Sequence, residues 1–284
     1  MRRPVCQPRR TPANLAANHN QQHTGARAMG PLLTGHTAVV TGAATGIGEA
    51  IAVGYAREGA KIVCLDINSE GAARTAEAIR KAGGTAWSHA LDVADRAACA
   101  AMAGTVDKEA GQISILVNNA GINRRNPFTG DPVAVMKDWD DIISINLAGT
   151  FNVTHAFLGH LRATRGRIVN LASIQAFMHV RTPNSPAYTT SKHGVMGLTR
   201  ALAAELGKDG IRVNAIGPGL IETAINADAR AKNPGIVDVF LQHTPLGRTG
   251  KPEDIVGPAI FLASDMAQYV TGSIVMADGG YRTV

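Results

Sequence analysis

The sequence predicts a doubly wound α/β fold, in which helices cover both faces of one parallel sheet. Apolar runs rich in β-branched residues recur along the chain and alternate with alanine-rich stretches of helical period. The first of these runs ends in a glycine-rich turn. Strands of a sheet that is covered on both faces are continuous apolar runs, which is the pattern seen here. We expect a single domain that spans residues 31–284.

Six runs are predicted as strands, and aliphatic residues dominate each of them. They lie at residues 37–41, 61–66, 113–119, 167–173, 211–216 and 273–278. Helical stretches between them include residues 69–82, 96–110 and 187–207. The repeated order of strand, helix and strand implies parallel pairing. In such a sheet the ligand lies beyond the carboxyl ends of the strands, at the switch point of the topology.

The composition is that of an ordinary globular protein, with 45% hydrophobic and 18% charged residues. No apolar run approaches the ~20 residues that a membrane-spanning helix needs. The chain has three scattered cysteines, Cys6, Cys64 and Cys99. They form neither a disulfide framework nor a metal cluster, so we expect no metal and a reducing compartment such as the cytoplasm.

The net charge of +6 is concentrated at the start of the chain. Residues 1–30 hold five arginines and no acidic residue, which leaves +1 for residues 31–284. The nearly neutral body predicts no binding to nucleic acid. The first 30 residues are poor in large apolar side chains and are predicted to be a disordered basic extension, with Met29 as an alternative start. A transit peptide is the other interpretation, although this segment contains no serine.

The glycine-rich turn "TGAATGIGEAIA" lies where the first strand should lead into a helix. Gly42, Gly46 and Gly48 permit a tight turn that brings backbone N–H groups close to a ligand, and Thr45 and Ile47 complete the loop. The N-terminus of a helix attracts a pyrophosphate. A turn that is merely rich in glycine is the alternative, but the position after the first strand favours a dinucleotide site of the Rossmann type.

The second predicted strand ends at Asp66, eighteen residues after Gly48. A carboxylate at this point can accept hydrogen bonds from the adenosine ribose hydroxyls and repel a 2′-phosphate. No arginine occurs among residues 43–45, and Ile67 rather than a basic residue follows the acid. The sequence therefore predicts NAD as the cofactor, although Asp66 could instead cap a helix.

In "SPAYTTSKHG", Tyr188 stands four residues before Lys192 at the start of a predicted helix. Residues at this spacing share a helical face. A nearby cation lowers the pKa of a phenol from ~10 toward neutrality, which would make Tyr188 a usable acid or base. A surface tyrosine and a solvated lysine are the alternative interpretation of the pair alone.

Together, the motifs resemble those of the classical short-chain dehydrogenase/reductase family over residues 33–284. Besides the glycine turn and the Tyr–Lys pair, the chain has "NNAG" at 118–121, "PG" at 218–219 and "DGG" at 278–280. "NAGINRR" and "KDWDDIISINLAGTF" resemble the branch that oxidises sugar acids, such as gluconate 5-dehydrogenases and 2-deoxy-gluconate 3-dehydrogenases. The resemblance implies a Rossmann-type sheet, hydride transfer between an alcohol and a ketone, and a homotetramer.

The resemblance also implies a role for individual residues. Tyr188 would be the acid/base, Lys192 would lower its pKa and hold the nicotinamide ribose, and Ser173 would bind the substrate oxygen. Asn146 would complete a catalytic tetrad by anchoring a water molecule that relays the proton. The implied cofactor contacts beyond those named above are Asp92, Val93, Asn119, Ala120, Gly121, Pro218, Gly219, Ile221 and Thr223.

The segment between Ser173 and Tyr188 is about two residues longer than is usual in the family. The candidates for substrate contact are Arg124 and Arg125 after the "NNAG" motif, with His179 and Arg181 in the lengthened segment. Arginine suits a carboxylate, because its guanidinium binds carboxylates through paired hydrogen bonds. These arginines could also be solvated or contact a neighbouring subunit.

We therefore expect an NAD-dependent oxidoreductase that interconverts a secondary alcohol and a ketone on a sugar acid, sugar or polyol. A 3-oxoacyl reductase that acts on a carrier-bound chain is one alternative, although that role usually draws on NADPH. A non-catalytic protein that senses dinucleotides is the other. The expected partners are a small-molecule alcohol or ketone and further copies of the chain, with neither nucleic acid nor membrane.

Overall fold

The computed structural model describes residues 30–180, 185–232 and 235–283. Apart from Gly30, these residues belong to one unit, Pro31–Val284. The predicted basic extension, except for Gly30, lies outside the described residues, and so does Arg181.

Seven parallel strands in the described part of the chain form one sheet in the order β3-β2-β1-β4-β5-β6-β7. The strands are β1 (Thr37–Thr41), β2 (Lys61–Asp66), β3 (Ala86–Ala90), β4 (Ile115–Asn118), β5 (Arg167–Leu171), β6 (Arg212–Pro218) and β7 (Ile274–Ala277). The chain runs outward from β1 to β3 and then crosses back to β4, which pairs with β1. The switch point predicted for the ligand therefore lies between β1 and β4.

β3 was not among the predicted strands. It pairs with β2 in the register Ile62↔Ala86 and forms the edge of the sheet. Only its first residue is buried, as is common for a strand with a neighbour on one side alone. An edge strand of this kind does not produce the continuous apolar run on which the prediction relied.

The three predicted helices are confirmed to within one residue at each end: α2 (Ser69–Lys81), α3 (Arg96–Ala110) and α7 (Pro186–Leu206). Asn68, Asp95 and Ser185 cap them with side-chain oxygens that accept from backbone N–H groups. The other α-helices of the described residues are α1 (Gly46–Arg57), α4 (Pro132–Ile142), α5 (Gly149–Ala156), α6 (Leu158–Thr164), α8 (Ala224–Lys232), α9 (Gly235–Leu241) and α10 (Glu253–Ala263). None of the described helices is long and apolar enough to span a bilayer.

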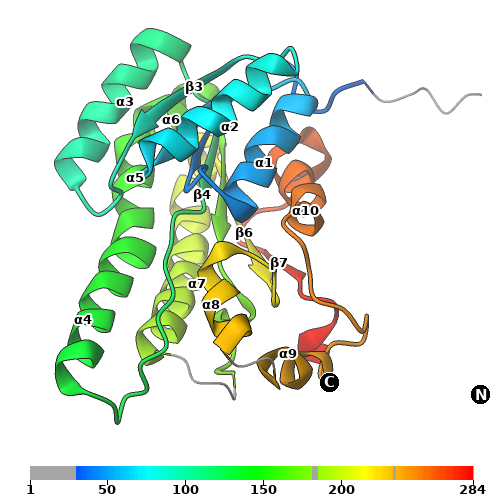
Figure 1. Cartoon of the computed structure of the whole chain (residues 1–284). Helices are drawn as coiled ribbons and strands as arrows, with labels where there is room; N and C mark the ends of the chain where they lie inside the picture. Colours follow the sequence, from blue (N-terminus) through cyan, green and yellow to red (C-terminus); the bar gives the residue numbers. More distant parts are fainter. Residues whose placement is uncertain (1–29, 181–184, 233–234, 284) are drawn as a thin grey trace, which may run out of the picture. The chain divides into compact units, whose positions relative to one another are not determined.

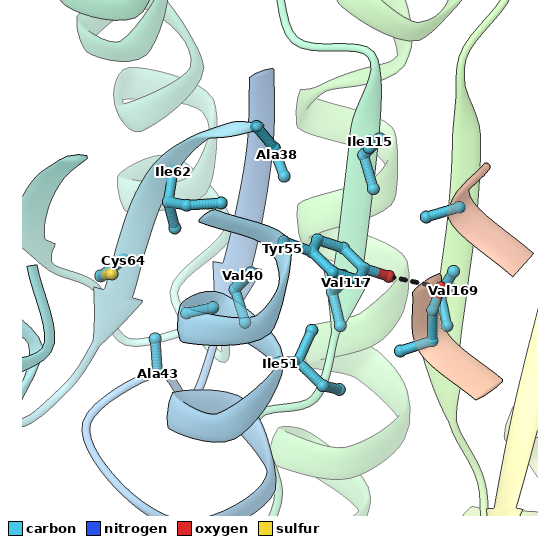
Figure 2. Close-up of a cluster of buried hydrophobic side chains, with 14 of the residues drawn as sticks. Ala38, Val40, Ala43, Ile51, Tyr55, Ile62, Cys64, Ile115, Val117 and Val169 are labelled. Atoms are coloured by element: carbon cyan, nitrogen blue, oxygen red, sulfur yellow. Dashed lines mark hydrogen bonds between the residues drawn. The ribbon is translucent and has the colours of Figure 1, made fainter. Parts of the chain in front are cut away.

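Helices lie on both sides of the sheet (Figure 1). Consecutive strand residues point to opposite faces, and each face has its own core. Ala38 and Val40 pack with α1, α2 and α10, whereas Val39 between them packs with α3, α5 and α7. Figure 2 shows the first of these cores, where the phenol of Tyr55 donates a hydrogen bond to the Ala259 carbonyl at 2.9 Å. This bond ties α1, which follows the glycine loop, to α10 near the end of the chain.

A buried polar ladder crosses the second face. Asn118 donates to the Thr154 hydroxyl and to the Asn170 amide oxygen, each at 2.9 Å. Asn170 donates in turn to the Thr199 hydroxyl at 2.9 Å. These side chains join α5, β4, β5 and α7 just below the carboxyl end of the sheet. They hold the strand ends that carry the motif residues at fixed positions.

Candidate active site

The glycine-rich loop connects β1 to α1 as predicted. Gly42 and Gly46 have φ angles of +64° and +63°, which side-chain-bearing residues rarely adopt. A Cβ atom on Gly48 would overlap the carbonyl oxygen of Gly42. The loop can therefore close tightly onto the first turn of α1, whose N–H groups point to the space above the sheet.

Asp66 fastens the end of β2 to this loop. Its carboxylate accepts hydrogen bonds from the N–H of Ala44 at 3.0 Å and from the N–H of Asn68 at 2.8 Å. The residue that caps α2 is Asn68, whose side chain accepts from Gly71. The helix-capping alternative for Asp66 is therefore wrong, and its carboxylate lies beside the glycine loop.

The "NNAG" segment closes the other side of the loop. The side chain of Asn119 donates to the carbonyls of Thr41 and Gly42, each at 3.0 Å. The Thr41 hydroxyl accepts from the N–H groups of Asn119 and Ala120. Because β4 is the neighbour of β1, residues far apart in the sequence meet here at the switch point.

Asp92 and Val93 follow β3, beyond the Asp66 end of the site. The Asp92 carboxylate accepts from the N–H of Ala94 at 2.9 Å, and the Val93 carbonyl accepts from the Asn152 side chain at 3.1 Å. Val93 is buried against Gly149, where a Cβ atom would lie 2.6 Å from it. These contacts hold the turn after β3 against α5.

The loop after β6 completes this half of the site. Pro218 ends β6, and a Cβ atom on Gly219 would lie 2.8 Å from the Asp278 Cα, so β7 and this turn pack closely. The side chain of Thr223 lies beside Gly46 of the glycine loop, 3.2 Å from where a Cβ of Gly46 would stand. Ile221 is buried and forms a parallel bridge with Gly250.

Ser173 and Tyr188 come together at the end of β5. The Ser173 hydroxyl accepts from the N–H of Gln175 at 3.1 Å, which fixes its oxygen near the Tyr188 phenol. Tyr188 lies in the first turn of α7, whose start is set by the Ser185 cap. The lengthened segment before α7 therefore still delivers the phenol to the serine.

Lys192 lies one turn further along α7 and is almost fully buried. Its ammonium donates to the Leu171 carbonyl at 2.8 Å and lies 5.5 Å from the centre of the Tyr188 ring. The solvated-lysine alternative is therefore wrong for this pair. Burial lowers the pKa of Lys192 to about 8, because the buried ammonium loses its hydration.

The electrostatics of Tyr188 correct one prediction. Burial raises the pKa of the Tyr188 phenol above its ordinary value, while the Ser173 side chain and the charge of Arg125 act in the opposite direction. Lys192 was predicted to bring this pKa toward neutrality. In the structure its ammonium is directed to a backbone carbonyl, and the protein's own charges do not outweigh burial.

Asn146 lies in a π-helical turn, Ile143–Ala148, between α4 and α5. Its side chain forms a pair of hydrogen bonds with the backbone of Ile122, accepting from the N–H at 2.8 Å and donating to the carbonyl at 2.9 Å. It also donates to the Ser191 hydroxyl at 3.3 Å, next to Lys192. Turns of this kind are rare and often occur at functional sites.

Comparison with known proteins identifies the family to which this chain belongs. The family model described as enoyl-(acyl carrier protein) reductase, which represents short-chain dehydrogenases/reductases, matches residues 42–282. The chain belongs to the short-chain dehydrogenase/reductase family. It is an oxidoreductase that acts on CH–OH groups with a dinucleotide cofactor.

Individual relatives share most of the chain. The D-threitol dehydrogenase of Mycolicibacterium smegmatis is 42% identical over 250 residues, which are 88% of this chain and 94% of that protein. The gluconate 5-dehydrogenase of Gluconobacter oxydans is 35% identical over 249 residues, 87% of this chain and 95% of that one. A crystal structure of a gluconate 5-dehydrogenase from Burkholderia cenocepacia, in complex with NADP and tartrate, matches with a TM-score of 0.83 and 37% identity, covering 89% of this chain and 97% of that chain.

The residues predicted to contact the substrate do not all lie together in the structure. The guanidinium of Arg124 forms an ion pair with Asp141 of α4 at 2.8 Å. Arg125 is half-buried, and its charge acts on Tyr188. His179 lies beside the start of α7, since its Nδ1 is 2.8 Å from the Thr189 hydroxyl. Arg125 and His179 thus lie near the catalytic end, and Arg124 faces away.

Sequence reasoning missed several polar residues that hold the site. The Thr189 hydroxyl donates to Gln175, so the proton between Thr189 and His179 must come from His179 Nδ1. Asn226 accepts from the N–H of Thr223 and donates to the Ile221 carbonyl. The spacing of an asparagine three residues after Thr223 is a turn signal that could have been noticed. Gln175 and Ser191 carry no such local signal.

Proposed function

We propose that this enzyme is an NAD-dependent dehydrogenase that interconverts a secondary alcohol and a ketone on a sugar acid, sugar or polyol. The observation that carries the reaction is the buried ammonium of Lys192, which lies 5.5 Å from the centre of the Tyr188 ring on the same face of α7, with the Ser173 hydroxyl near the phenol. The oxidoreductase class belongs to the family, whereas the cofactor preference, the residue roles and the substrate are our proposal.

The residues around the glycine loop fit a dinucleotide. The loop closes on the N-terminus of α1, where only glycine can stand at position 48, and this leaves N–H groups for a pyrophosphate. Each carboxylate oxygen of Asp66 accepts one backbone hydrogen bond and retains a second lone pair for a ribose hydroxyl. A 2′-phosphate at the same place would be repelled by this carboxylate, which supports NAD.

When bound, the nicotinamide accepts or donates the hydride. The chain supplies positions and protons. Ser173 donates a hydrogen bond to the reacting oxygen of the substrate and is held for this by the N–H of Gln175. In alcohol oxidation the Tyr188 oxygen accepts the proton of the substrate hydroxyl, and in ketone reduction it gives that proton back. Lys192 holds its side-chain nitrogen 5.5 Å from the centre of the Tyr188 ring, and we propose that it takes up the proton that leaves the phenol.

Asn146 lies beyond Lys192 in this series of catalytic groups, since it donates to the hydroxyl of the neighbouring Ser191. Its side chain forms hydrogen bonds with the backbone of Ile122 and with the Ser191 hydroxyl. We propose that it keeps the turn before α5 in the shape needed to hold a water molecule between Lys192 and solvent. We propose that the proton passes from the substrate through Tyr188 and Lys192, and that Ser173 donates to the substrate oxygen without taking part in proton transfer.

Arg125 supports a substrate with a negatively charged or strongly polar group. Its guanidinium is half-buried and close enough to Tyr188 for each charge to affect the other. The named activities of the relatives, on D-threitol and on gluconate, are consistent with a polyhydroxylated substrate. His179 is a second candidate, and Arg181 stays a prediction outside the described residues.

A substrate and cofactor panel tests this proposal. Purified enzyme is assayed with D-gluconate, D-threitol and a 3-oxoacyl thioester, each with both nicotinamide cofactors, by the absorbance of the reduced nicotinamide. We expect turnover of a polyhydroxylated compound with NAD. Turnover restricted to the thioester with NADPH would establish the reductase alternative, and cofactor binding without turnover of any compound would establish the sensing alternative.

We also propose that the enzyme is a cytoplasmic homotetramer. Apolar side chains on α4 and α5, among them Met136, Trp139 and Phe151, are exposed in the single chain, and such residues would be covered in an assembly. The described cysteines, Cys64 and Cys99, are free thiols, as in proteins of a reducing compartment. Light scattering of the purified enzyme should give four times the mass of the chain.

A further inference from the structure

The segment after the "NNAG" motif, residues 122–126, alternates between two sides. Arg124 pairs with Asp141, and the Asn126 side chain donates to Asp138 at 3.1 Å, so both of these residues face α4. Arg125 between them faces Tyr188, since their charges interact. Asn123 lies in the same segment, directly before Arg124 and two residues before Arg125.

The backbone on either side of Asn123 is fixed to the catalytic machinery. Ile122 is held through both its N–H and its carbonyl by the side chain of Asn146. The carbonyl of Arg124 accepts from the N–H of Ser185, the residue that caps α7. The position of Asn123 is thus set by the same two elements that set the positions of Tyr188 and Lys192.

The amide oxygen of Asn123 is buried and has no hydrogen-bond donor among the residues that the structure describes. Two other buried side-chain atoms of those residues share this property, Asn118 Oδ1 and His160 Nδ1. Asn118 belongs to the polar ladder inside the domain, and His160 lies on α6. Only Asn123 combines an unpaired acceptor with a place beside the reacting groups. A buried acceptor without a donor costs folding free energy, so a donor supplied by a ligand would be bound there.

We propose that Asn123 is a specificity-determining residue whose amide oxygen accepts a hydrogen bond from a second hydroxyl of the substrate, separate from the hydroxyl that is oxidised. The inference rests on the proposed function and narrows its substrate to polyhydroxylated compounds. A plain acyl chain brings no donor to this oxygen and leaves it unpaired, and a carboxylate is repelled by it. A carboxylate belongs beside Arg125, so a sugar acid can satisfy both residues at once.

The test compares Asn123→Leu with the matched variant Asn126→Leu, which makes the same change on the α4 side of the segment. Both proteins and the unmodified enzyme are assayed with D-gluconate, D-threitol and their monodeoxy analogues, and kcat/KM is measured for each compound and for NAD. Melting temperatures are measured without ligands.

We expect the unmodified enzyme to lose at least about tenfold in kcat/KM on one monodeoxy analogue, because that analogue leaves the acceptor unpaired. Asn123→Leu should abolish this discrimination, leave the KM for NAD within twofold, and raise the melting temperature. Asn126→Leu should lower the melting temperature, since it removes a bond to the buried Asp138, and keep the discrimination.

Three results would overturn the inference. Retained discrimination in Asn123→Leu would show that another residue reads the hydroxyl. A rise in the KM for NAD larger than the loss on the polyol would assign the hydrogen bond to the cofactor. A lower melting temperature with unchanged discrimination would assign Asn123 a structural role. An unmodified enzyme that is inactive on every polyhydroxylated compound would instead overturn the proposed function, and the inference with it.

Discussion

At the scale of single residues, the catalytic phenol and ammonium are held in places that disfavour their charged forms. Burial raises the pKa of Tyr188 and lowers the pKa of Lys192 to about 8. Burial therefore shifts both groups toward the neutral state, so that neither is locked in its charged form. The pair is suited to work in either direction of the reaction.

Replacing Tyr188 by phenylalanine keeps the ring and removes the transferable proton. General acid–base catalysis contributes ~10²- to 10⁴-fold, so kcat should fall by at least ~10². Folding and NAD binding should persist, because neither depends on the phenol oxygen. Steady-state kinetics and an NAD titration measure the two effects. If more than a tenth of the activity remains, another group transfers the proton.

Replacing Lys192 by methionine tests the cost of the buried ammonium. Its pKa is about 8 in the folded protein and ~10.4 in an unfolded chain, so the unfolded state binds more protons between these values. The free energy of unfolding contributed by this residue therefore rises with pH across that window, and its burial penalty is complete below it. Lys192→Met should raise stability at pH 7 and remove this pH dependence.

Urea denaturation of both proteins at pH 7 and at pH 10 measures this difference. The same variant should bind NAD more weakly and turn over more slowly. An unchanged pH dependence of stability would mean that the ammonium is better solvated than its contacts indicate.

Asp66 is expected to decide between the two nicotinamide cofactors. A carboxylate that binds the ribose hydroxyls and repels a 2′-phosphate should favour NAD by at least about tenfold, or ~1.4 kcal/mol. Asp66→Ala should narrow that preference. The ratio of kcat/KM for the two cofactors measures it in both proteins. Equal use of both by the unmodified enzyme would contradict the assignment, and the NADP in the gluconate 5-dehydrogenase structure makes this a sharp test.

At the scale of elements, the buried polar ladder is the part of the core where a single substitution should lower stability most. Asn170 is fully buried and both accepts from Asn118 and donates to Thr199. Asn170→Leu has nearly the same volume but removes one hydrogen bond from each of these partners, at a cost of ~0.5–1.5 kcal/mol for each bond. The melting temperature should fall by several degrees.

Differential scanning calorimetry measures that fall. Thr105→Val is the control, because the Thr105 hydroxyl bonds to Ala101 on the exposed surface of α3. If the Asn170→Leu protein is as stable as this control, apolar packing of the leucine compensates fully for the lost hydrogen bonds of the ladder.

Helices and strands with a strong local sequence pattern were predictable. Elements whose form depends on tertiary contacts were not. The helices α2, α3 and α7 have apolar periodicity and capping residues, so their limits follow from the sequence. β3 is an edge strand with little burial, and the π-helical turn at Asn146 has no known local signature. For the site, the motif residues were predicted to lie together at the strand ends. The different directions of Arg124 and Arg125 depend on where α4 packs, which the sequence does not show.

At the scale of the whole molecule, the basic extension is predicted to be dispensable. Residues 1–28 carry arginines and prolines and too few apolar side chains to form a core of their own. A protein that begins at Met29 should keep its activity and its melting temperature. Thermal denaturation and the panel assay compare it with the full chain. A loss of more than a few degrees would show that the extension packs on the domain.

The order of the strands has a consequence for folding. β1 pairs with β4 as well as with β2, the next strand in the sequence. Thr223, which follows β6, lies against Gly46, which follows β1. The dinucleotide site is thus assembled from contacts of long sequence separation, which form slowly because large loops must close first. A chain emerging from the ribosome has its glycine loop early but its complete site only after β6 has docked. Added cofactor should therefore slow unfolding without speeding the early steps of refolding, and its binding reports that the sheet is finished.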